Sequence, residues 1–94
     1  MYGQHTTFIV GEESREQIEQ AIAGLRDVVK GQDGFSSITF FFDERTHEFL
    51  STSLWDSKEA ADTGGKVLTK AVQDALGDDL KDQVLNRSIE MLEV

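Results

Sequence analysis

The chain has 94 residues, of which 38% are hydrophobic, and its nine basic and eighteen acidic side chains give a net charge of −9 at pH 7. This composition is typical of a single globular domain covering residues 1–94. The acidity argues against a nucleic-acid surface, which needs clustered Lys and Arg, and against anionic membranes. No apolar run approaches the ~20 residues of a membrane span. With no signal-peptide features and no cysteine, we expect a cytoplasmic protein.

A strand and a helix are predicted in the first third of the chain. Residues 4–10 alternate between two faces, with His5 and Phe8 on opposite sides. A helix follows, and Ser14 and Gln17 have the spacing of a capping box at its start. The apolar residues of this helix recur at the spacing of one helical face: Ile18, Ala21, Ile22, Leu25, Val28 and Val29.

Residues 34–59 hold five of the six Phe and the only Trp, so the rest of the chain is expected to pack around them. The polar residues 43–46 separate two runs rich in Phe, Ile, Thr and Leu, which indicates a β-hairpin. Pairing the two ends of this polar segment places Phe40 opposite Phe49. One face then carries Ile38, Phe40, Phe42, Phe49 and Trp55, and the other carries Phe35, Phe41, Leu50 and Leu54. Both faces are substantially apolar, so each needs a cover.

A second helix and a last strand complete the predicted elements. Either Asp56 or Ser57 begins the helix. Gly64 and Gly65 lie inside it, at a cost of about 1 kcal/mol each relative to alanine. We interpret this pair as a bend or as a point of close packing on the sheet, with close approach of a ligand as the alternative. Residues 84–94 alternate again and predict the last strand.

This order of elements predicts an α+β fold of the ferredoxin-like βαββαβ type. Both helices would cover one face of a four-stranded antiparallel sheet, which leaves the other, partly apolar face open. A domain of this size buries only about 60–65% of the surface that its unfolded chain exposes, and a large apolar face calls for a partner. We therefore expect a homodimer that forms through the open sheet face.

The sequence resembles the antibiotic biosynthesis monooxygenase-like domains of the dimeric α+β barrel superfamily. The resemblance rests on the βαββαβ order, on Gly34 and Phe35 at the start of the second strand, and on residues 54–61, LWDSKEAA, after the third. It implies a dimeric α+β barrel covering nearly the whole chain. The superfamily includes cofactor-free oxygenases acting on polyketide or quinol substrates, haem-degrading enzymes, and small proteins with no established reaction.

The functional residues of the two enzymatic branches match this sequence only in part. The resemblance places Trp55 in the pocket between sheet and helices. The haem-degrading branch combines this Trp with an Asn on the first strand and a His ten residues later. Here the first strand has no Asn and the later position is Gly65, so haem degradation is not expected. The polyketide-oxidising branch has Asn where Ser51 stands, and Tyr and Arg in the following helix, which residues 56–77 lack.

A ligand pocket is predicted on the hairpin face that carries the tryptophan. Its predicted members are Trp55, Phe49, Ser51, Ser53, Phe40 and His5. Hydroxyls among aromatic rings suit a mostly apolar cavity with a few orienting groups. The alternative is that Trp55 belongs to the core and that the serines merely leave room for helix packing. His5 is also a candidate general base, whereas His47 is expected at a solvated surface.

No metal, nucleotide or other cofactor is expected. The acidic residues lack metal-ligand spacing, the charged residues 78–82 lack the pattern of a calcium loop, and no glycine-rich phosphate fingerprint is present. The leading hypothesis is a cofactor-independent monooxygenase-like protein that binds a small apolar or aromatic molecule. One alternative is a non-catalytic ligand-binding or stress-associated dimer, and another is a structural dimer whose pocket is filled by its own side chains.

Overall fold

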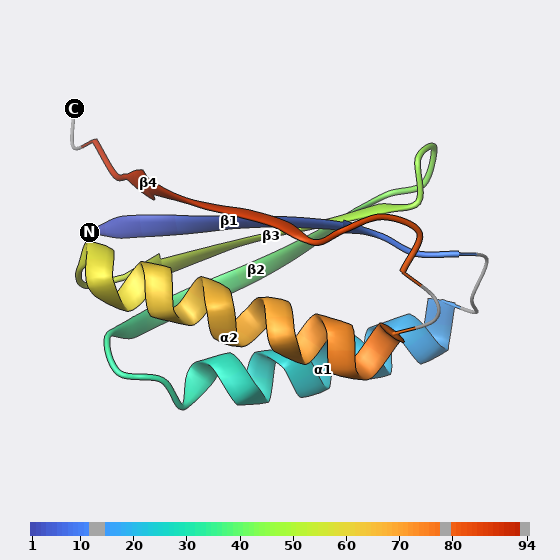
Figure 1. Ribbon diagram of the computed structural model, residues 1–94, viewed down its shortest axis with the longest axis horizontal. Helices are drawn as coiled ribbons and strands as arrows, with labels where there is room; N and C mark the ends of the chain where they lie inside the picture. The colour runs from blue at the N-terminus through green and yellow to red at the C-terminus, as the bar shows by residue number, and fades with distance from the viewer. Residues whose placement is uncertain (12–14, 78–79, 93–94) are drawn as a thin grey trace.

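The computed structural model describes residues 1–11, 15–77 and 80–92. Its elements are β1 (Tyr2–Ile9), α1 (Arg15–Lys30), β2 (Phe35–Asp43), β3 (Glu48–Trp55), α2 (Lys58–Leu76) and β4 (Leu85–Glu90). The strands form one antiparallel sheet in the order β2-β3-β1-β4, and both helices lie on the same face of it (Figure 1). The predicted ferredoxin-like βαββαβ fold is therefore confirmed.

The hairpin between β2 and β3 has a register two residues away from the predicted one. Phe40 pairs with Ser51 and not with Phe49. The turn consists of residues 44–47, and His47 closes it in a left-handed conformation with φ of 59°. The predicted pairing was wrong because it allowed for a two-residue turn. Since side chains alternate with a period of two, a shift of two residues keeps each of these side chains on its predicted face.

An irregularity at the start of β2 moves Phe35 to the other face. The register shifts so that Phe35 pairs with Trp55 while Ser37 pairs with Leu54. Phe35 therefore lies on the helix-facing side, where its ring meets the Trp55 indole edge-on with centroids 5.5 Å apart. Its predicted place on the open face was wrong, because alternation in a sequence does not reveal a bulge.

The helix-facing side of the sheet is aromatic at both ends and polar in the middle. At the hairpin end, Phe49 stacks on Phe8 with ring centroids 5.4 Å apart, and it packs at a tilt against Phe42 with centroids 4.6 Å apart. At the other end lies Trp55, which is fully buried. The middle is formed by two cross-strand rows of polar residues: Ser51, Thr6 and Asn86, then Ser53, Gln4 and Ser88.

The start of α2 follows one of the two predicted alternatives. Ser57, rather than Asp56, caps the helix, and its hydroxyl accepts a hydrogen bond of 3.1 Å from the backbone N–H of Ala60. The capping box predicted for α1 depends on Ser14, which lies outside the described residues, as does part of the charged segment 78–82.

Two adjacent glycines let the backbone of α2 lie directly on the sheet. A Cβ atom placed on Gly64 would overlap the indole of Trp55, and one placed on Gly65 would lie 2.7 Å from the amide of Gln4. Both glycines are buried. Close packing, one of the predicted interpretations of this glycine pair, is therefore what the structure contains.

No described segment of the same chain covers the opposite face of the sheet. Its apolar side chains are Ile9, Phe41, Leu50, Leu54, Leu85 and Ile89. Phe41 and Leu85 are 56% and 57% exposed, which is high for large hydrophobic side chains. In the described parts of the chain, neither helix combines the length and the hydropathy needed to cross a membrane.

We predict opposite stability effects for two glycine-to-alanine substitutions. Gly64→Ala should lower the free energy of unfolding by roughly 1–3 kcal/mol, because overlap with Trp55 outweighs the gain in helix propensity. At Gly24 in α1, no atom lies within 4 Å of the position of a new methyl group. Gly24→Ala should therefore raise the free energy of unfolding by about 0.5–1 kcal/mol. Urea unfolding of both variants measures the difference, and equal responses would contradict close packing at Gly64.

Candidate functional site

A cavity of about 390 Å³ lies between α1 and the hairpin end of the sheet. Four Phe rings from β2 and β3 and three apolar side chains from α1 form most of its wall: Phe40, Phe41, Phe42, Phe49, Ile18, Ile22 and Ala23. Small-molecule sites typically occupy about 300–1,000 Å³ and are mainly apolar. The size and the lining therefore suit a small aromatic or apolar ligand.

The cavity exists because the apolar residues of α1 do not all pack closely against the sheet. Ile18, Leu25 and Val29 on this stripe are 5%, 2% and 0% exposed. Ile22, which lies between them on the same face, is only half-buried, and the neighbouring Ala23 is exposed and small. Ala23, which has a short side chain, lies opposite the part of β2 that carries Phe40 and Phe42. Space is therefore left between the helix and the sheet.

The structure divides the predicted pocket residues into three groups. Phe40 and Phe49 line the cavity; Ser51, Ser53 and Trp55 are buried farther along the same side of the sheet; His5 lies on the opposite side. The histidine pairs with Thr52 on β3 and with Arg87 on β4, so the sheet separates it from the other five. That these residues bind a ligand stays a prediction.

Trp55 is held as a core residue within one chain. Its indole Nε1 donates a hydrogen bond of 2.8 Å to Ser53 Oγ, and this hydroxyl contacts the backbone carbonyl of Gln4 at 3.4 Å. The ring is enclosed by Phe35 on one side and by the backbone at Gly64 on another. The polar atom of the indole is therefore satisfied without a ligand.

Three buried oxygens in the middle of the helix-facing side have no hydrogen-bond partner among the described residues: Gln4 Oε1, Thr6 Oγ1 and Ser51 Oγ. Thr6 and Ser51 are cross-strand neighbours, and Ser51 also pairs with the cavity residue Phe40. An unsatisfied buried polar group costs about 1–3 kcal/mol, and such a group in a native structure needs an explanation, such as a bound water or a catalytic role. The Ser51 hydroxyl is fully buried and is not part of the cavity lining, but its residue pairs in the sheet with Phe40, which is.

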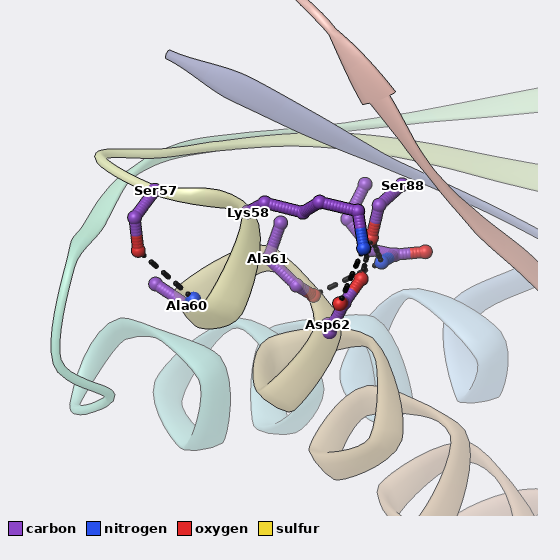
Figure 2. A network of polar contacts seen from close by, with 7 residues as sticks. Ser57, Lys58, Ala60, Ala61, Asp62 and Ser88 are labelled. Carbon is purple, nitrogen blue, oxygen red and sulfur yellow. Dashed lines mark hydrogen bonds and ion pairs between the residues drawn. The ribbon is translucent and has the colours of Figure 1, made fainter.

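A chain of polar contacts anchors the first turns of α2 to β1 and β4 (Figure 2). Gln4 Nε2 donates to the carbonyl of Ala61 at 2.9 Å and to Ser88 Oγ at 2.8 Å. The Ser88 hydroxyl donates in turn to Asp62, which also accepts from Lys58 at 3.1 Å. The Ser88 bond, followed by the Lys58 bond, lowers the pKa of the Asp62 carboxyl. These contacts orient the Gln4 amide and leave its oxygen as the atom without a partner.

The polar groups that line the cavity were not predicted as site residues. They are Glu19 and Arg26 from α1 and His47 from the turn, whose ring lies edge-on to Phe42 at 6.0 Å. Arg26 is exposed and forms no ion pair with a described residue. The available signal was its position four residues after Ile22, which places both on one helix face. Across the described ranges, no three His, Asp or Glu residues are grouped to hold a metal ion.

We predict different stability effects for the two buried serines. Ser53→Ala leaves the Trp55 N–H buried without an acceptor, so the free energy of unfolding should fall by about 1–3 kcal/mol. Ser51→Ala removes a hydroxyl that has no partner, so the same quantity should stay constant or rise by up to about 1 kcal/mol. Urea unfolding of both variants provides the measurement. Equal losses would show that the Ser51 hydroxyl has a structural partner.

The model of the antibiotic biosynthesis monooxygenase family matches residues 1–63. No curated protein matches the chain. Among solved structures, the chain is similar to SnoaB, a cofactor-independent oxygenase from Streptomyces nogalater, with 14% identity, 99% and 94% coverage of the two chains and a TM-score of 0.73. It is also similar to Rv0793 from Mycobacterium tuberculosis, with 15% identity, 99% and 96% coverage of the two chains and a TM-score of 0.73. A third similar structure is NE2512, a protein of unknown function from Nitrosomonas europaea, with 7% identity, 99% and 90% coverage of the two chains and a TM-score of 0.79.

At such identities the solved structures support the fold alone, whereas the family match spans residues 1–63 of the 94. That segment runs from β1 into the start of α2, and it contains both the cavity-lining strands and the buried Trp55. The resemblance drawn from the sequence is therefore confirmed. The chain belongs to the antibiotic biosynthesis monooxygenase family.

Proposed function

We propose that this protein is a cofactor-independent monooxygenase-like protein that binds a small apolar or aromatic molecule between α1 and the β2–β3 hairpin. The observation that carries the proposal is the cavity of about 390 Å³ walled by Phe40, Phe42 and Phe49. The unpartnered hydroxyl of Ser51, next in the sheet to Phe40, supports it. Membership of the monooxygenase family and the likeness to SnoaB, described as a cofactor-independent oxygenase, agree with this class.

An oxygenase without a cofactor must take its electrons from the substrate. If the substrate has an activated methylene group next to an aromatic ring, one oxygen atom of dioxygen is transferred to the methylene carbon. The second oxygen atom leaves as water together with both methylene hydrogens. The methylene becomes a carbonyl, and atoms and electrons balance without a further reductant. The protein would then hold the substrate, exclude water and position the reacting carbon. The aromatic wall would bind the ring, and Ser51 would orient a substrate oxygen.

A second function, a non-catalytic small-ligand-binding or stress-associated dimer, is favoured by the position of the tryptophan. Trp55 is enclosed by the core and does not line the cavity. Oxygen uptake by the protein loaded with its ligand separates the two functions. Formation of an oxygenated product supports the enzyme, whereas saturable binding without a product supports the binder.

We also propose a homodimer that forms through the open face of the sheet. The exposed side chains of Phe41, Leu85 and Ile89 support this arrangement, because burying them against a second copy removes apolar surface from water. Most of the cavity wall lies on the helix side of the sheet, so pairing of the open faces would leave that wall accessible in both copies, whereas Phe41, which also lines the cavity, would be buried in the interface.

Filling the cavity should weaken binding of an aromatic probe. Ala23→Trp introduces a large ring at the exposed side of the cavity, so we expect binding of 2-naphthol to weaken at least about tenfold because the ring competes for the same wall. Ala75→Trp, an exposed site on α2 away from this cavity, is the matched control and should bind as the original protein does. Fluorescence titration measures both, and unchanged binding by Ala23→Trp would contradict the location of the site.

A charge at the centre of the open face should dissociate the dimer. Thr52 pairs with His5 and with Thr39 on that face. Thr52→Glu would bring two carboxylates into the dimer interface, where like charges cost several kcal/mol, so dimerisation should weaken roughly a hundredfold. Sedimentation velocity measures this, with Thr63→Glu on the exposed surface of α2 as the control. A dimer that tolerates Thr52→Glu would exclude this face as its interface.

A further inference from the structure

We propose that the cavity selects an aromatic molecule that carries a carboxylate, and that Arg26 binds this group. The inference rests on the proposed function, because it names the class of ligand for the same cavity. It depends on where Arg26 lies, on what surrounds its guanidinium, and on the charge of the rest of the chain.

Arg26 lies at one end of an otherwise apolar helix wall. Ile18, Ile22 and Arg26 are four residues apart and follow one another along the cavity face of α1. At 1.5 Å per residue, Arg26 is about 12 Å along the helix axis from Ile18. A flat ligand lying against the Phe rings would therefore meet the guanidinium at one of its ends.

The guanidinium of Arg26 has no counter-ion from its own helix. The positions three and four residues away on either side are Ile22, Ala23, Val29 and Lys30, and none of them is a carboxylate. Asp27 follows directly, but adjacent helical residues do not face each other. Among the described residues that line the cavity, Glu19 is the acidic one; it lies about two turns away and has another interaction.

An arginine that forms no ion pair with any described residue, beside an apolar wall, is notable in a chain with twice as many acidic as basic side chains. The net charge of −9 disfavours anions over most of the surface, so a local cation determines where an anion can bind. A guanidinium matches a carboxylate with two parallel hydrogen bonds. A neutral ligand would fill the apolar part of the cavity but would leave these donors to water.

Two naphthalene derivatives of nearly the same shape test the inference. We expect the protein to bind 2-naphthoate roughly five- to tenfold more tightly than 2-naphthamide. The expected ratio is modest because Arg26 is exposed and solvent weakens its interaction with the carboxylate. Arg26→Gln should remove this preference, weakening naphthoate by the same factor and changing the amide less than about twofold. Arg26→Lys, which keeps the charge but not the paired donors, should give an intermediate preference.

Lys30→Gln is the matched control. Lys30 is an exposed cation one turn farther along α1, is not part of the cavity lining, and gives the same change in net charge. Equal binding of acid and amide to the original protein, or an equal loss in Lys30→Gln and Arg26→Gln, would overturn the inference and leave the cavity as a binding site. If neither compound binds any of these proteins, the proposed function fails and the inference fails with it.

Discussion

The contact between α2 and Trp55 is the constraint on which the rest of the structure depends. Gly64 leaves room for the indole, and Gly65 lets the helix backbone lie on Gln4. Any side chain at these positions would lift α2 from the sheet. Because α2 lies so close, its first turns can bond to Gln4 and to Ser88, and β4 is thereby joined to the helix layer at the sheet edge (Figure 2).

Close packing under α2 contrasts with looser packing under α1. The two helices share one face of the sheet (Figure 1), but α1 lies over β2. The side chains of β2 on this face include the rings of Phe40 and Phe42, and α1 carries the small Ala23 beside them in the cavity wall. The predicted pocket residues are consequently divided. Trp55 is part of the core, while Phe40 and Phe49 face the free space. Binding and any chemistry would therefore centre on the α1 side, with Ser51 at the boundary between the two regions.

The alternation of apolar and polar residues predicted which side chains of β1 and β3 are buried, because a strand has a period of two and a covered face excludes water. The register was not predictable in the same way. Pairings that differ by two residues bury the same side chains, so only the left-handed residue His47 and the four-residue turn distinguish them. The bulge that turns Phe35 inward likewise leaves no mark on the alternation.

The sequence by itself determined the order of elements, a start of the second helix at Asp56 or Ser57, the faces of most strands and the family, because these depend on local periodicity and on motifs within a few residues. The tertiary structure decided where space remains. It placed His5 on the far side of the sheet, left the Ser51 hydroxyl without a partner, and brought Arg26 to the Phe-lined cavity. A cavity is the volume that packing fails to fill, so it depends on distances between segments that no local pattern specifies.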